Sequence, residues 1–193
     1  MSTKPRILVF AGSAREGSLN KKLARIAATC AREAGAEATL VDLRDYPIPL
    51  YDGDLEEREG MPPFAVKLRE LFLSHQGLLI ASPENNGSVT SLLKNTIDWL
   101  SRDYQGRSGL EPYSGKVAAM IGASPGGFGA ISSLANLRPI LTKLTVLVIP
   151  EQVTLSKAHQ AFKDDGTFVD ERNLKAVTTV ARRLVEMTAK VNP

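Results

Sequence analysis

Cysteine and histidine are scarce in this sequence. Cys30 is the single cysteine, so no disulfide can form within the chain, and this usage is typical of a reducing compartment. The two histidines, His75 and His159, lie far apart in the sequence. A zinc site built from cysteine and histidine needs several of these residues close together. The composition therefore excludes a disulfide framework and argues against a metal centre of this kind.

Long apolar runs and an excess of one charge are also absent from the sequence. No segment approaches about 18 consecutive apolar residues, the length typical of a membrane-spanning helix. The 24 Lys and Arg residues against 21 Asp and Glu residues give a net charge of only +3, without the basic stripe expected of a nucleic-acid-binding surface. We expect no signal peptide, because residues 1–6 lead into a strand-like segment without the longer apolar stretch and small-residue cleavage site of such a peptide. We therefore expect a soluble cytoplasmic protein with neither a nucleic-acid nor a membrane partner.

The residues that are present have an ordinary globular composition, 43% hydrophobic and 23% charged over 193 residues. This length predicts a single domain spanning residues 1–193, since domains average about 100–200 residues. Short, mainly apolar runs typical of strands alternate with segments of helical periodicity. The runs lie at 7–11, 38–43, 78–81, 116–121 and 146–149, and the helical segments at 19–34, 63–72, 91–100, 128–144 and 174–188. The pattern predicts an α/β fold, a three-layer sandwich with a five-stranded parallel sheet between helices.

Three features of the sequence predict where helices and strands are broken or replaced by a loop. Pro139 is expected to bend or split the helix over 128–144, because proline lacks the N–H that a helix interior needs. Pro150 is expected to stop the strand over 146–149. The segment 44–62, rich in proline, glycine and acidic residues, is expected to form one long loop, and loops of this length are uncommon unless functional.

Three loops follow the first, third and fourth predicted strands. They are residues 12–20, 82–88 and 122–129, and each is rich in glycine, serine or asparagine. In a parallel sheet of order 2-1-3-4-5 these strands are neighbours, and their carboxyl ends lie at the same edge. The three loops are therefore expected to converge on one crevice at that edge.

The first loop has the glycine spacing of a nucleotide-binding loop but lacks its reactive residues. Ser18 and Leu19 follow Gly17 where a triphosphate-binding loop has lysine and a hydroxyl residue, so triphosphate hydrolysis is disfavoured. No Gly-x-Gly-x-x-Gly follows the strand, which disfavours a dinucleotide site. A hydroxyl- and amide-rich turn at a helix start suits a terminal monophosphate. The alternative interpretation is that Ser18 only caps the helix and that Arg15 is solvated.

Four segments together resemble the NADPH-dependent FMN reductases, a family that includes quinone and chromate reductases. They are Gly12–Asn20, Ser82–Ser88, Leu93–Arg102 and Ala123–Gly129. The resemblance runs from about Arg6 to Glu151 and covers most of the chain. It implies a flavodoxin-like fold, one non-covalent FMN per subunit and a homodimer or homotetramer.

The resemblance also implies which residues bind the cofactor. Those bordering the phosphate would be Ser13, Arg15, Ser18, Leu19 and Asn20; those bordering the ring would be Pro83, Glu84, Asn85, Asn86 and Gly87, with Ser124 near the flavin. Asn85 stands where the family usually has tyrosine, which removes an aromatic side chain beside the ring. For Glu84 we expect a structural role, accepting hydrogen bonds from local amides; pairing with an arginine of another subunit, or an influence on the flavin, are the alternatives.

The activity implied by the resemblance is a two-electron reductase. NADPH or NADH would deliver hydride to FMN, and a quinone would then take the electrons. This chemistry belongs to the cofactor and demands no protein nucleophile or base. One alternative is an electron carrier or binding module of flavodoxin type with little turnover of its own. Another is a chain that has lost FMN and serves as a structural or regulatory subunit.

Overall fold

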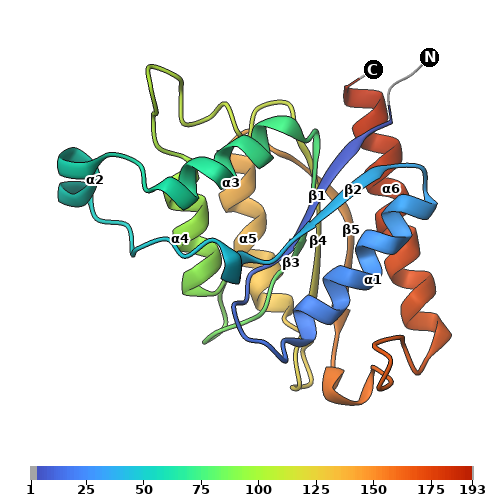
Figure 1. Cartoon of the computed structure of the whole chain (residues 1–193). Helices are drawn as coiled ribbons and strands as arrows, with labels where there is room; N and C mark the ends of the chain where they lie inside the picture. Colours follow the sequence, from blue (N-terminus) through green and yellow to red (C-terminus); the bar gives the residue numbers. More distant parts are fainter. Residues whose placement is uncertain (1–3, 193) are drawn as a thin grey trace.

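Five parallel strands form the centre of the molecule (Figure 1). The structure is a computed structural model that describes residues 4–192. The strands occur in the order β2-β1-β3-β4-β5, which confirms the predicted fold class and strand order. Their bounds are β1 (Arg6–Ala11), β2 (Glu37–Val41), β3 (Gly77–Ala81), β4 (Val117–Ala123) and β5 (Leu147–Leu155).

Helices cover both faces of the sheet and bury an apolar core on each side. The helices α1 (Leu19–Glu33) and α6 (Glu171–Val191) lie on one face. The helices α3 (Pro63–Ser74), α4 (Ser91–Leu100) and α5 (Ile131–Lys143) lie on the other. All residues of β3 and β4 are buried, which explains why their sequences are continuously apolar rather than alternating.

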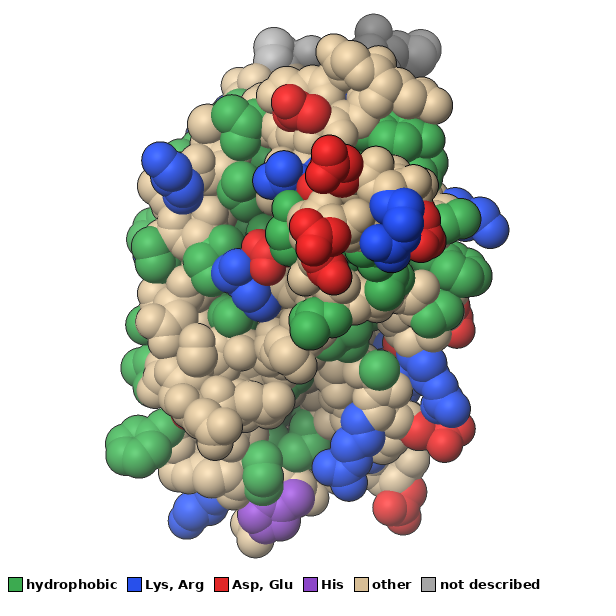
Figure 2. All heavy atoms as spheres, turned by 90° about the vertical axis from the view of Figure 1, so that its left-hand side faces the viewer, with side chains coloured by type: hydrophobic (Ala, Val, Ile, Leu, Met, Phe, Trp, Pro, Cys, Tyr) green, Lys and Arg blue, Asp and Glu red, His purple; other side chains and the backbone are tan. Residues whose placement is uncertain are grey.

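The segment 44–62 is not one long loop, so that prediction is wrong. It contains part of the short 3-10 helix η1 (Leu43–Asp45) and the helix α2 (Gly53–Glu59), none of whose residues is buried. Acidic side chains gather on the face of the molecule over α2 (Figure 2). Between the two helices the chain crosses α4, where the indole Nε1 of Trp99 donates to the Pro49 carbonyl at 2.8 Å. A residue buried in α4 therefore orders this exposed segment.

Pro150 does not stop β5, contrary to the prediction. The strand continues to Leu155, and its pairing with β4 shifts register between Ala118 and Met120, opposite Pro150. Proline is compatible with a strand at the edge of a sheet or at a bulge, because no ladder hydrogen bond needs its N–H there. The Arg138 guanidinium donates to the carbonyls of Val148 and Ile149 beside the irregularity.

The predicted helix over 128–144 begins later than expected and is not split. Gly129 and Ala130 both have left-handed backbone conformations, with φ of 61° and 70°, so α5 begins at Ile131. Pro139 lies inside the helix, which continues to Lys143. The loss of one backbone hydrogen bond is tolerated because the helix packs its apolar residues on the sheet.

Candidate functional site

The loops that follow β1, β3 and β4 meet at the carboxyl edge of the sheet, at the bottom of Figure 1. Together with the start of α4 they enclose a cavity of about 430 Å³. Its size falls in the range of small-molecule sites, roughly 300–1,000 Å³. The lining residues come from segments 12–15, 18–20, 83–85, 90–92 and 123–125. The convergence predicted from the strand order is therefore confirmed.

Most residues predicted for the site line this cavity. They are Ser13, Arg15, Ser18, Leu19, Asn20, Pro83, Glu84, Asn85 and Ser124. Asn86 and Gly87 are not among the lining residues; they form an exposed turn closed by a bridge between Asn85 and Ser88. Both have positive φ, 51° and 73°, which matches the Asn-Gly hairpin turn. These two residues thus shape the loop outside the cavity lining.

The β1–α1 loop presents a helix start to the cavity. Ser18 is the N-cap of α1, and its Oγ accepts a hydrogen bond from the Lys21 backbone N–H at 3.4 Å. The first N–H groups of a helix have no acceptor within the helix, and Leu19 and Asn20 are the first two residues of α1. Within residues 4–192 no hydrogen bond or ion pair engages the exposed Arg15 guanidinium. This end of the cavity therefore offers donors and one cation to an anion.

Asn20 connects α1 to the end of β4. Its side chain is buried, the Nδ2 donates to the Ala123 carbonyl at 2.8 Å, and the Oδ1 accepts from the Ala123 N–H at 2.9 Å. Both backbone groups of Ala123 thus depend on one side chain that is distant in sequence. Asn20 consequently holds the loop containing Ser124 beside the start of α1.

Two residues that position the first loop were missed by the sequence analysis. The buried Lys21 directs its Nζ to Asp42 at 2.6 Å and to the Ala14 carbonyl at 3.3 Å. Thr90 caps α4 by accepting from the Leu93 N–H, and its hydroxyl donates to the Gly12 carbonyl at 2.7 Å. A threonine before an apolar helical run is a sequence signal for such a cap. No local pattern indicates the role of Lys21, because its partners lie on other segments.

Gly12 allows β1 to approach α4 and the third-strand loop closely. A Cβ at this position would lie 3.0 Å from the Leu93 Cβ and 3.3 Å from the Pro83 Cδ. These separations are tighter than ordinary van der Waals contact. A side chain at this position would therefore push Leu93 or Pro83 aside where three chain segments meet at the cavity.

Glu84 holds the third-strand loop against α5. Its Oε2 accepts a hydrogen bond from the Ser133 N–H at 3.1 Å, in the first turn of a helix whose own N-cap, Ala130, has no side-chain cap. The Ser133 hydroxyl also lies 2.7 Å from the Ser82 hydroxyl. Glu84 thus has a structural role, but its donor is the amide of a distant helix and not a local amide of its own loop, as the sequence had predicted.

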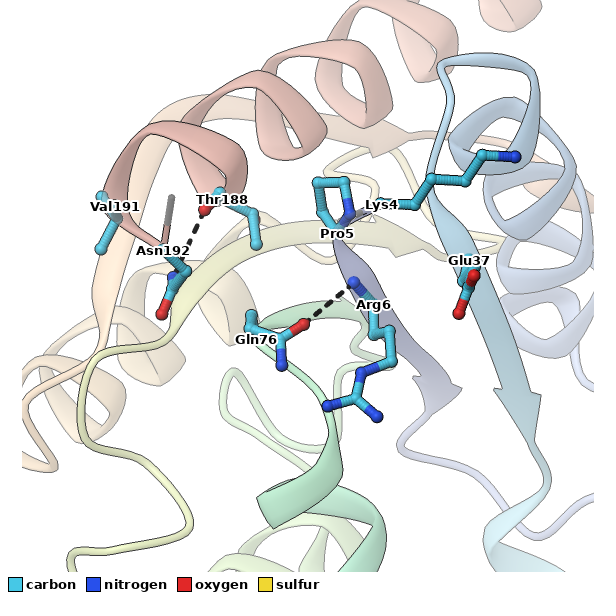
Figure 3. Close-up of a pocket in the computed structure, with 8 residues that line it drawn as sticks. All are labelled: Lys4, Pro5, Arg6, Glu37, Gln76, Thr188, Val191 and Asn192. Carbon is cyan, nitrogen blue, oxygen red and sulfur yellow. Dashed lines mark hydrogen bonds between the residues drawn. The ribbon is translucent and has the colours of Figure 1, made fainter. Parts of the chain in front are cut away.

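A second cavity, of about 970 Å³, lies at the opposite, amino end of the sheet (Figure 3). The Gln76 side chain crosses it to accept a hydrogen bond from the Arg6 N–H at 3.1 Å. None of the three loops lines this cavity. It is bordered by Lys4, Pro5, Arg6, Glu37, Gln76, Thr188, Val191 and Asn192.

The amino end of the sheet also contains a buried lysine whose titration should affect stability. Lys116 is 5% exposed and donates to the His75 carbonyl; burial, and secondarily the positive charge of Arg6, lowers its pKa to about 8. The folded protein therefore releases this proton at a pH where the unfolded chain still binds it. Relative to a Lys116→Met variant, the free energy of unfolding should rise above about pH 8, by up to about 1.4 kcal/mol per pH unit.

Urea denaturation of the two proteins between about pH 7 and pH 9.5 tests this dependence. Arg6→Gln serves as a second variant, since losing the neighbouring cation should shift the rise to higher pH. Stability curves that stay parallel for the wild-type and Lys116→Met proteins would contradict the prediction.

The first cavity has the chemistry of a binding site for an anionic, partly apolar molecule. Its lining combines hydroxyls, amides and a helix start with the apolar groups of Leu19, Pro83, Leu92 and Pro125.

In the part of the chain that the structure describes, no three His, Cys, Asp or Glu side chains are grouped so as to hold a metal ion. Across the same residues, no helix combines the length and hydropathy needed to span a bilayer.

Comparison with known proteins identifies the family. The model of the NADPH-dependent FMN reductases matches residues 5–160. The chain belongs to this family. It is 35% identical over 192 residues to an NAD(P)H-dependent FMN reductase of Pseudomonas aeruginosa, covering 95% of this chain and 99% of that protein. It is 33% identical over 180 residues to a quinone reductase of Escherichia coli, covering 92% of each.

A solved structure agrees with this assignment. FerB, a flavoenzyme NAD(P)H:(acceptor) oxidoreductase of Paracoccus denitrificans, superposes with a TM-score of 0.82 at 28% identity, covering 97% of this chain and 98% of that one. As a member of the FMN reductase family, the protein is an oxidoreductase whose cofactors are FMN and NAD(P)H. The predicted family, enzyme class and cofactors are therefore confirmed.

Proposed function

We propose that the protein transfers two electrons from NAD(P)H, through FMN bound in the cavity at the carboxyl edge, to quinones or related acceptors. The observation that carries the proposal is that three loops predicted to bind one ligand enclose a single cavity beside the start of α1. The quinone reductase relatives support the acceptor class. The chemistry that bound FMN supplies is acceptance of hydride and delivery of two electrons.

The residues at the β1 side fit the phosphate of FMN. The N–H groups of Leu19 and Asn20 at the start of α1, the hydroxyls of Ser13 and Ser18, and the Arg15 guanidinium would bind it. A helix start attracts an anion through its free N–H groups and its dipole. The Asn20 side chain would contribute mainly by holding Ala123, since it already bonds both backbone groups of that residue.

The residues at the β3 and β4 side fit the flavin ring. Pro83, Asn85 and Ser124 line the cavity there, and the turn at Asn86 and Gly87 would border it from outside. The loop is held by α5, since Asn136 Nδ2 donates to the Gly87 carbonyl at 2.9 Å and Ser133 bonds Glu84. A loop held at several points keeps its backbone groups in place for the edge of a flat ring.

We further propose that the protein is cytoplasmic and forms a homodimer or homotetramer. The single cysteine supports a reducing compartment. Phe128, in the loop before α5, and Ile131, the first residue of α5, are 81% and 46% exposed, and exposed apolar side chains of this size are suited to contact between subunits. Light scattering of the purified protein would determine the number of subunits.

Arg15→Ala tests the phosphate end of the site. Losing a charge-assisted hydrogen bond to the phosphate should raise the dissociation constant for FMN about tenfold, with the fold unchanged. Arg44→Ala is the matched control, because Arg44 lies outside the cavity lining and pairs with Glu16 at 3.7 Å. Titration followed by flavin fluorescence measures both; equal dissociation constants for the wild-type and Arg15→Ala proteins would remove Arg15 from the site.

Steady-state kinetics tests the activity itself. The FMN-loaded protein should oxidise NADPH or NADH continuously when a quinone is present, and the two donors should be compared directly. Loss of flavin absorbance on adding NAD(P)H, followed by its return on adding quinone, would support the reductase. Bound flavin that neither nicotinamide reduces would instead support an electron carrier.

A further inference from the structure

Of the residues that the structure describes, only two with charged side chains line the cavity at the carboxyl edge, Arg15 and Glu84. The rest of the lining consists of hydroxyl, amide and apolar groups with the backbone. An unbalanced charge in a partly enclosed cavity acts on a bound ion more strongly than the same charge in open water. The positions of these two groups therefore bear on which ligands the cavity accepts.

The two charges lie on opposite sides of β3. Arg15 belongs to the loop after β1, on one side of that strand. The Glu84 carboxylate reaches the other way, since its Oε2 accepts from Ser133 in the helix that follows β4. Its second oxygen has no recorded hydrogen bond among residues 4–192. The cavity is thus positive at the β1 side and negative at the β4 side.

This hydrogen bond fixes the place of the negative charge. The Ser133 N–H belongs to the first turn of α5, whose dipole favours a carboxylate. The loop around Glu84 is also held by the bond between the Ser82 and Ser133 hydroxyls. Glu84 therefore cannot move its charge away from the cavity without giving up the cap of α5.

We propose that Glu84 determines the charge of the electron acceptor, admitting uncharged quinones and disfavouring anionic ones. The inference rests on the proposed function, in which the phosphate of FMN occupies the positive side, and adds that the acceptor approaches the ring from the side of Glu84. A carboxylate there repels an acceptor that carries a sulfonate or carboxylate group. It leaves an uncharged quinone of the same ring system unaffected.

The test compares Glu84→Gln with wild type, using a naphthoquinone and its sulfonated derivative as probes. Glutamine keeps an oxygen that can accept from the Ser133 N–H, so the cap of α5 is retained. Glu16→Gln is the matched control, since Glu16 carries the same charge on the neighbouring loop but does not line the cavity. Two readouts are needed: kcat/KM for each probe, and the dissociation constant of each probe from the oxidised FMN-loaded protein, without turnover.

The expected result is a change in the preference of the protein between the two probes. Glu84→Gln should raise kcat/KM and lower the dissociation constant for the sulfonated quinone by about fivefold, as removal of one like charge at several ångströms predicts. These changes are measured relative to the uncharged quinone, whose values report any other effect of the substitution on the site. Glu16→Gln should leave the ratio between the two probes within about twofold of wild type. In the wild-type protein, added salt should raise kcat/KM for the sulfonated quinone more than for the uncharged one, because salt screens the repulsion.

Two failures are distinguishable. If the protein binds FMN and reduces quinones but Glu84→Gln changes both probes equally or neither, Glu84 does not select acceptor charge and only this inference falls. If the protein does not bind FMN at all, both the proposed function and this inference are wrong. If Glu84→Gln fails to fold, the test is the effect of salt on kcat/KM of the wild-type protein. Equal effects of salt on the two quinones would overturn the inference.

Discussion

Asn20→Leu is expected to lower the free energy of unfolding by about 3 kcal/mol and to weaken FMN binding at least about tenfold. Leucine branches at Cγ as asparagine does but can neither donate to the Ala123 carbonyl nor accept from its N–H. Both backbone groups would lose a bond of 2.8 to 2.9 Å at a buried position. Each such loss costs about 1–3 kcal/mol. FMN affinity should fall because the loop that carries Ser124 is no longer held at the start of α1.

Urea denaturation measures the stability change, and flavin fluorescence measures the dissociation constant. Asn136→Leu is the matched control. Its Nδ2 makes one exposed bond to the Gly87 carbonyl, so its loss should cost less than about 1 kcal/mol. If the two variants lower the free energy of unfolding equally, the bonds between Asn20 and Ala123 contribute no more to stability than the exposed bond of Asn136.

Trp99→Ala should destabilise the protein by about 4 kcal/mol, the largest stability effect that we expect. The indole is fully buried in the core between α3, α4, α5 and the sheet. It packs edge-on against Tyr51 with ring centroids 5.1 Å apart and donates to the Pro49 carbonyl. Alanine would leave a cavity and release the segment between η1 and α2 from α4.

Trp99→Phe separates these two contributions. Phenylalanine keeps most of the buried area but loses the bond to the Pro49 carbonyl, which Asn95 Nδ2 still donates to at 2.9 Å. A loss of about 1–2 kcal/mol is therefore expected from denaturation curves. Equal losses for the alanine and phenylalanine variants would show that packing of the indole contributes little beyond its hydrogen bond.

The sheet and the place of the site follow directly from local patterns in the sequence. Continuously apolar runs such as 7–11 and 78–81 indicate strands covered on both faces, and β1 and β3 are buried there almost completely. The strand order brings the loops after β1, β3 and β4 to one edge, where nine residues predicted for the site line one cavity. Such patterns suffice for the strands because periodicity is a local property, whereas the order of the strands came from the flavodoxin-like fold that the resemblance implies.

The interruptions of the elements could not be predicted in the same way. Pro150 was expected to end a strand, yet β5 continues through it. Whether a proline is tolerated depends on whether its missing N–H faces another strand, and β5 lies at the edge of the sheet beside a shift in register. The acidic helix α2 was likewise not predicted, because the prolines and glycines of its segment indicate a loop.

The sequence by itself determined the class of fold and, through its resemblance to a known family, the strand order and the edge of the sheet where the loops meet. Only the tertiary structure decided what individual side chains do there: Asn20 bonds Ala123, Lys21 bonds Ala14 and Asp42, and Glu84 caps α5. The reason is physical. Strand and helix periodicities are properties of neighbouring residues, whereas a buried polar side chain takes as partner whichever group the folded chain brings within about 3 Å.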